Sequence, residues 1–77
     1  MISKTERVLS IYDRLLAGKV LVKREEADRF EVDERTIQRD FDDIRAHFSD
    51  EEYSGRELVY SRRRKGYIVR KNEQKSK

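Results

Sequence analysis

Residues 33–48 carry the repeat that most constrains how this chain can fold. Four apolar residues recur there at the spacing of one helical face: Ile37, Phe41, Ile44 and Phe48. Asp33 stands just before the repeat, where its carboxylate can cap the free N–H groups of a first helical turn. We therefore expect a helix that is capped by Asp33, ends near Phe48 and buries its apolar face in a core.

The opposite face of this helix is polar and basic. Arg35 and Arg39 fall almost opposite Ile37, with Gln38 and Asp42 on the flanks. Guanidinium and amide groups match phosphate oxygens and the base edges of the DNA major groove. A helix that enters the major groove needs such a face, but an ordinary amphipathic helix with a solvated charged face explains the same residues.

Three further residues of this helix have separate expectations. Thr36, in the first turn, can donate to a phosphate near the positive end of the helix or bond back to its own helix. Asp40 lies near the apolar edge, where we expect it to pair with an arginine instead of contacting DNA. His47, near the C-terminus of the helix, is interpreted as structural.

The N-terminal part of the chain predicts a first helix. Ser3 and Glu6 have the spacing of a capping box. The wide apolar stripe that follows predicts a core helix over residues 4–17, and Gly18 stands where an αL C-cap belongs.

A short strand and a second helix are expected next. Residues 20–22 are β-prone but too few to stand alone, so we expect them to pair with a later strand. Residues 23–30 predict a short helix with Ala27 and Phe30 facing inward. The tight connection to the helix after Asp33 is typical of a helix-turn-helix.

The pattern changes after Phe48. Residues 49–55 are polar and turn-like, and the β-prone runs 58–60 and 67–69 predict a hairpin. Residues 61–66 form its basic tip, where we expect Gly66 to supply a backbone φ that other residues resist. A hairpin after a helix-turn-helix is a wing.

Four consecutive cations crowd this tip: Arg62, Arg63, Arg64 and Lys65. Their mutual repulsion is relieved if they face phosphates or enter a narrow minor groove. The alternative is a charged edge that prevents aggregation between strands, although one or two lysines would suffice for that purpose.

Charge is unevenly distributed along the chain. Residues 1–52 hold 10 Lys and Arg against 14 Asp and Glu, whereas residues 53–77 hold 9 against 2. A basic C-terminal third suggests a polyanionic partner on that side. Residues 71–77 lack apolar side chains and are interpreted as a polar tail or the start of a linker.

Several classes of function are disfavoured. The 77 residues contain no cysteine and one histidine, which excludes a thiolate or His-cluster metal site. No catalytic constellation, phosphate loop or dinucleotide turn is visible, so we expect no enzyme and no cofactor. No apolar run reaches the length of a membrane span and no secretory signal is present, so a cytoplasmic, nucleoid-associated protein is expected.

Residues 18–44 resemble the helix-turn-helix of DeoR-type regulators. They are closer still to the N-terminal domain of WYL-domain regulators, in which the recognition helix typically contains R-T-I-x-R-D followed by an apolar residue. Residues 35–41 carry this motif, and residues 58–60 and 65–69 resemble the wing of the same family. The resemblance implies a bacterial or phage transcription factor whose DNA-facing residues are Arg35, Thr36, Gln38 and Arg39.

Three residues depart from the family pattern. Asp33 replaces the usual N-cap serine, and Glu31 stands where glycine is common, which costs about 1 kcal/mol if the turn needs αL. Glu26 replaces a core leucine, so we expect helix 23–30 either to sit slightly differently or to be less well anchored. Such regulators normally continue into a ligand-sensing and dimerising region, which implies an excised domain or a naturally short protein, and a possible homodimer through a region absent here.

Together these observations predict a small α+β domain, a winged helix-turn-helix over residues 1–70 with a tail over 71–77. Its expected function is sequence-specific binding of double-stranded DNA as a transcriptional regulator. Helix 33–48 would enter the major groove, and the basic wing 61–66 would contact the flanking backbone or minor groove. The alternative is a winged-helix protein-interaction module that does not bind DNA, which the acidic balance of residues 1–52 supports.

Overall fold

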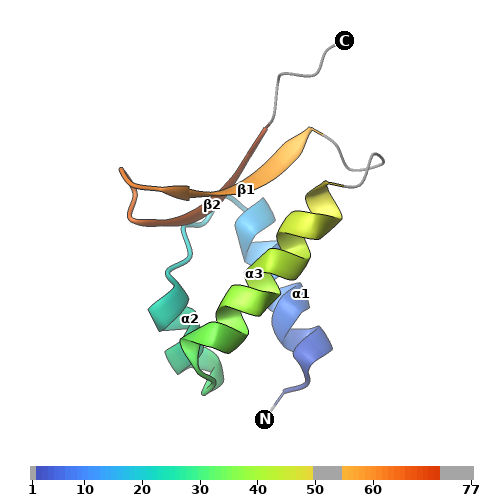
Figure 1. Cartoon of the computed structure of the whole chain (residues 1–77), viewed down its shortest axis with the longest axis vertical. Coiled ribbons are helices and arrows are strands. Elements are labelled where there is room, and N and C mark those ends of the chain that lie inside the picture. Colours follow the sequence, from blue (N-terminus) through green and yellow to red (C-terminus); the bar gives the residue numbers. More distant parts are fainter. Residues whose placement is uncertain (1, 50–54, 72–77) are drawn as a thin grey trace.

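The computed structural model describes residues 2–49 and 55–71 of the chain. These ranges form three helices followed by an antiparallel hairpin (Figure 1). The elements are α1 (Lys4–Leu16), α2 (Lys23–Phe30), α3 (Glu34–Phe48), β1 (Arg56–Ser61) and β2 (Gly66–Lys71). The predicted α+β composition and order of elements are confirmed. Residues 50–54 of the predicted turn and 72–77 of the predicted tail lie outside the described residues.

Local side-chain caps define where the long helices begin. The hydroxyl of Ser3 accepts from the N–H of Glu6, and the Glu6 carboxylate accepts from the N–H of Ser3, both at 3.2 Å. Asp33 Oδ1 accepts from the N–H of Thr36 at 3.0 Å at the start of α3. The predicted caps are therefore confirmed, because each depends on residues only three positions apart. Helix α1 ends one residue before its predicted end, and Gly18 follows with φ +88°.

The connection between α2 and α3 contains a strained residue. Glu31 adopts the left-handed conformation, with φ 58° and ψ 45°. The N–H of Val32 then donates to the carbonyl of Ala27 at 3.0 Å and closes the end of α2. A left-handed backbone is unfavourable for a residue with a Cβ, and the turn has the αL conformation on which the expected cost of glutamate depends.

The hairpin places its tip residues in a four-residue turn. Tyr60 pairs with Tyr67 and Ser61 pairs with Gly66, so residues 62–65 form the tip. The expectation for Gly66 was wrong, because the left-handed residue of the turn is Lys65, with φ 59°. Glycine is needed at position 66 for space: a Cβ there would lie 2.5 Å from Cγ1 of Val20 and 2.9 Å from the carbonyl oxygen of Leu21.

The segment that crowds Gly66 also extends the sheet. Leu21 and Tyr67 exchange two backbone hydrogen bonds, with N···O distances of 2.9 and 2.7 Å. The prediction that residues 20–22 pair with a later strand is confirmed. Strand β2 consequently lies between β1 and this segment, and it includes Lys71, which was expected to begin the tail.

One core joins the helices to the hairpin. The apolar faces of the predicted helices and strands place seven residues in it: Ile11, Leu15, Phe30, Ile37, Phe41, Ile44 and Tyr67. Five are buried, whereas Phe30 and Tyr67 are half-buried and pack against the others. Leu58 of β1 is also buried, so the hairpin covers the core and does not project freely from the helices.

Two ion pairs are buried beside this core. Arg7 of α1 donates to both carboxylate oxygens of Asp40 in α3, at 2.5 and 3.1 Å. Arg14 of α1 makes the same two-pronged contact with Glu26 of α2, at 2.8 and 2.9 Å. The arginine partner expected for Asp40 is therefore confirmed. Glu26 is 3% exposed, and its contact with Arg14 joins α2 to α1 at the position where the family pattern has a leucine.

Candidate nucleic-acid interface

The outer face of α3 presents two arginines to solvent. Arg35 and Arg39 are exposed, whereas Ile37 and Phe41 on the inner face are completely buried. The rotation of the helix is set by this apolar face and by the bond between Asp40 and Arg7. The sequence predicted the same placement, because only one rotation of the helix about its axis buries a single apolar stripe.

The second group of cations lies at the hairpin tip. The four side chains from Arg62 to Lys65 are exposed. The turn that carries them is braced from inside, since Ser61 Oγ accepts from the N–H of Arg64 at 3.1 Å. The carbonyl of Ser61 also accepts from the N–H of Lys65 at 2.7 Å. Figure 1 shows the tip and the N-terminal half of α3 on the same side of the molecule, at the left.

The cations of the domain fall into two classes. Six make ion pairs: Lys4, Arg7, Arg14, Arg29, Arg45 and Arg70. None of the six cations predicted to contact DNA has a carboxylate partner within residues 2–49 and 55–71. The same is true of five further cations in these ranges: Lys19, Lys23, Arg24, Arg56 and Lys71. An exposed guanidinium without a local partner keeps its donors available for an external anion.

Thr36 bonds back toward its own helix start. Its hydroxyl donates to Asp33 Oδ1 at 2.8 Å, and its backbone N–H donates to the same oxygen. These two hydrogen bonds, followed by the smaller effect of the charges of Arg35 and Arg39, lower the pKa of Asp33 below its ordinary value. Of the two possibilities left open for Thr36, the structure thus has the local one, and the hydroxyl proton is not directed at an outside acceptor.

Gln38 is held by neighbours that the sequence did not reveal. Its Oε1 accepts from Nζ of Lys23 in α2 at 2.9 Å, and its Nε2 donates to Asp42 at 3.0 Å. Asp42 in turn accepts from Arg45 at 3.3 Å. The amide therefore has a fixed direction, with one N–H and one lone pair left for another molecule.

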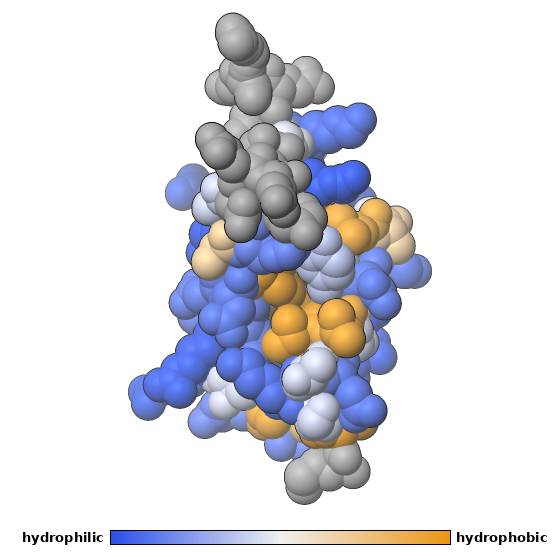
Figure 2. All heavy atoms as spheres, turned by 90° about the vertical axis from the view of Figure 1, so that its right-hand side faces the viewer, coloured by the Kyte–Doolittle hydropathy of each residue, from blue (hydrophilic) through white to orange (hydrophobic). Residues whose placement is uncertain are grey.

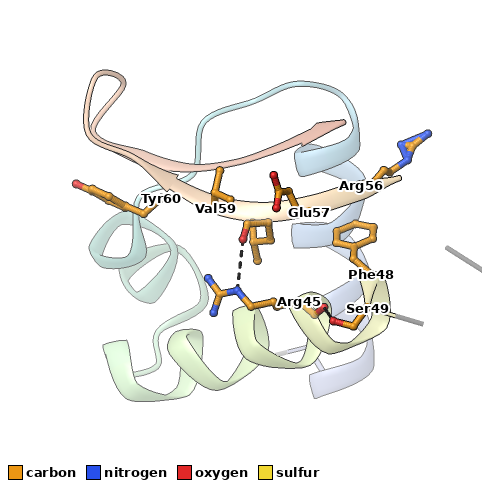
Figure 3. Close-up of a pocket in the computed structure, with 8 residues that line it drawn as sticks. Arg45, Phe48, Ser49, Arg56, Glu57, Val59 and Tyr60 are labelled. Carbon is orange, nitrogen blue, oxygen red and sulfur yellow. Dashed lines mark hydrogen bonds between the residues drawn. The ribbon is translucent and has the colours of Figure 1, made fainter. Parts of the chain in front are cut away.

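Arg45 connects the hydrogen-bonded side chains of Gln38 and Asp42 to the hairpin. Its Nε donates to the carbonyl of Leu58 in β1 at 3.3 Å, across the groove drawn in Figure 3. The groove has a volume of about 550 Å³. Tyr60, which is 53% exposed, lies at the end of the groove that is opposite Arg56. Lys23, Arg45 and Tyr60 are the polar residues of this region that the prediction missed. The Gln38–Asp42 and Asp42–Arg45 spacings gave a signal, because both pairs lie within α3, whereas the contacts from Lys23 to Gln38 and from Arg45 to Leu58 join separate elements.

His47 lies on the side of α3 that faces α1. Its ring packs edge-on against Tyr12, with centroids 5.6 Å apart, and is tilted against Phe48 at 5.8 Å. These ring contacts agree with the structural role that was predicted for it. Within the described part of the chain, no group of His, Cys, Asp and Glu is arranged to hold a metal ion.

No helix among the described residues has the length and apolar character needed to cross a membrane. Comparisons with protein-family models, curated proteins and solved structures find no match to this chain. The resemblance to DeoR-type and WYL-domain regulators therefore stays a prediction, and the functional argument depends on the geometry of the cations.

Proposed function

We propose that this domain is a winged helix-turn-helix that binds double-stranded DNA in a sequence-specific manner and acts in transcriptional regulation. The observation that carries the proposal is the set of six exposed cations without carboxylate partners, two on α3 and four on the hairpin tip. Elsewhere in the described chain, exposed arginines occur both with a carboxylate partner, as Arg70 with Glu57, and without one, as Arg24 and Arg56. What sets these six cations apart is that they are gathered on α3 and the neighbouring hairpin, and a polyanion is the partner that suits such a group best.

Helix α3 has the form required of a major-groove reader. Its inner face is anchored in the core, and its outer face offers the guanidinium forks of Arg35 and Arg39. Arginine in this setting binds guanine O6 and N7 or a phosphate. Gln38 would add one N–H donor in a fixed direction. The hydrogen bond between Thr36 and Asp33 would stabilise the first turn of α3 where it approaches the DNA backbone.

The hairpin tip would act as the wing. Its four cations sit on a braced turn at the edge of the molecule, so they can approach the flanking phosphates or a narrow minor groove. Such contacts increase affinity for any duplex, whereas contacts from α3 to base edges would select the sequence. We infer that the two elements divide affinity and specificity between them.

The test is duplex affinity at several salt concentrations, for the parent chain and for a variant with alanine at positions 62 to 65. The cognate duplex is first obtained by selecting bound sequences from a random pool. Each phosphate contact that is lost flattens the slope of log K against log salt by about 0.9. We expect two or three contacts to be lost, since a tight turn cannot aim all four side chains at the backbone.

The matched control replaces Lys4 and Lys19, two exposed cations that flank α1. Their removal should leave the slope unchanged, because they lie outside the proposed interface. If the tip variant also keeps the parental slope, the wing does not touch DNA. If the parent selects no duplex and shows no salt-dependent binding, the protein-interaction alternative replaces the DNA-binding proposal.

A further inference from the structure

Helix α1 carries a second apolar stripe on its outer side. Ile11 and Leu15 face the core and are at most 1% exposed, yet Leu9 is 55% and Leu16 is 40% exposed. With Thr5 and Tyr12, these two leucines follow the alternating spacing of four, three and four residues. That spacing is the seam of a helix that packs along another helix.

A groove lies beside this stripe, between α1 and α3. It has a volume of about 340 Å³, and its apolar lining comes from Val8, Leu9, Tyr12 and Ile44. Figure 2 looks onto the side of the molecule that carries α1 and the C-terminal end of α3, and apolar side chains gather in the middle of it. Stripe and groove together form an apolar surface that can receive the side chains of a second helix.

The border of the stripe is acidic. Glu6 and Asp13 are exposed along one side of it, and Asp13 has no ion pair with any residue in the described ranges. On the other side, Asp43 borders the groove with its side chain 57% exposed and pairs with Lys4 at 3.2 Å. A partner helix with lysine or arginine beside its apolar seam would meet Glu6 and Asp13 on one side and would compete with Lys4 for Asp43 on the other.

A second copy of the chain suits this border poorly. In an antiparallel pairing of two α1 helices about Leu9, Glu6 of one copy would approach Asp13 of the other. In a parallel pairing, the same acidic side would approach the groove of the other copy, where Lys4 is already held by Asp43 and no unpaired lysine or arginine of the described residues lines the groove. The chain's own residues 72–77 contain no apolar side chain that could fill the seam.

We propose that the stripe Thr5–Leu9–Tyr12–Leu16 and its groove form a docking site for an amphipathic helix of another protein, one whose apolar seam is flanked by basic residues. The surface is distinct from the cations of the candidate nucleic-acid interface. Figure 1 shows α1 on the right of the molecule and the hairpin tip on the left. The proposal therefore does not depend on DNA binding, and both partners could be held at once.

The probe is a synthetic helical peptide of about three heptads, with leucine at the seam positions and lysine on both flanks. Lysine flanks repel one another, which keeps the peptide from pairing with itself. Titrated into the full chain, it should shift the backbone NMR signals of α1 around Leu9 and Leu16. A peptide with glutamate flanks is the control, and it should leave the α1 signals in place.

Variants of the chain separate the apolar and the charged contributions. Leu9→Ser should weaken binding of the lysine peptide about tenfold or more, because the leucine would be buried on docking. Ile2→Ser is the matched control: Ile2 is 43% exposed but lines a different groove with Phe30 and Val32. Asp13→Lys should weaken the lysine peptide severalfold and improve binding of the glutamate peptide. Since these side chains are exposed, each variant should keep the parental melting temperature.

Three results would overturn the proposal. One is a lysine peptide that produces no shift in α1. Another is equal binding of the two peptides, which would show that the acidic border plays no part. The third is a parent chain that sediments as a dimer and becomes monomeric in Leu9→Ser, since a second copy would then be the occupant of the stripe.

Discussion

Replacing Asp40 with asparagine tests whether its ion pair with Arg7 holds α3 against α1. Asp40 is 1% exposed and accepts two hydrogen bonds from Arg7, whose side chain is 11% exposed. These bonds raise the pKa of Arg7 above its ordinary value, in spite of the opposing effect of burial. Asp40→Asn keeps the shape of the side chain but leaves a nearly buried guanidinium without its counter-charge.

We expect this substitution to cost about 3–5 kcal/mol, the usual penalty for breaking one side of a buried ion pair. A domain of this length has a total stability of roughly 4–12 kcal/mol, so the variant should lose a large part of its stability. The measurement is urea unfolding of parent and variant followed by far-ultraviolet circular dichroism, with the free energy of unfolding obtained by linear extrapolation.

Asp43→Asn provides the matched control. Asp43 also lies on α3 and also pairs with a cation of α1, Lys4, but both side chains are more than half exposed. Its loss should cost less than about 1 kcal/mol, because solvent screens the pair. Burial is thus the main difference between the two substitutions.

A double variant isolates the cause of the loss. Arg7→Met combined with Asp40→Leu removes both charges and fills their space with apolar atoms, so it should recover at least half of the lost stability. If Asp40→Asn costs no more than Asp43→Asn, the buried pair does not hold α1 against α3 and the reasoning fails.

Three other substitutions have definite expected outcomes. Gly66→Ala should destabilise the fold by about 1–3 kcal/mol, because its Cβ would meet Val20 and the Leu21 carbonyl; unchanged urea unfolding would show that this contact relaxes freely. Glu31→Gly should stabilise the domain by up to about 1 kcal/mol by relieving the left-handed backbone at φ 58°; a lower melting temperature would contradict this. Arg39→Ala should weaken the selected duplex by roughly 1–3 kcal/mol more than a random duplex; equal weakening of both would make Arg39 a phosphate contact only.

The elements of this domain follow from short-range patterns that can be recognised in the sequence. Ser3 with Glu6, and Asp33 with Thr36, make their contacts within one helical turn, so the helix starts were predictable. Helix α2 has the predicted bounds, and the apolar repeat of α3 gave its buried side. The exposed positions of Arg35 and Arg39 follow from the same periodicity, because a side chain opposite a buried stripe must face solvent. The tip cations are exposed because they form the turn of the hairpin.

Which residues meet across elements could not be identified from the sequence, because those contacts depend on the angles and distances at which the elements pack. Glu26 looked like a defect in α2, yet the crossing of α1 brings Arg14 onto both of its oxygens. Gly66 looked like a conformational requirement, whereas its role is to leave room for Val20. Lys23 reaches Gln38 only because α2 and α3 lie side by side. Local sequence thus determined which residues face outward, and tertiary packing decided which polar groups have partners and which remain available to another molecule.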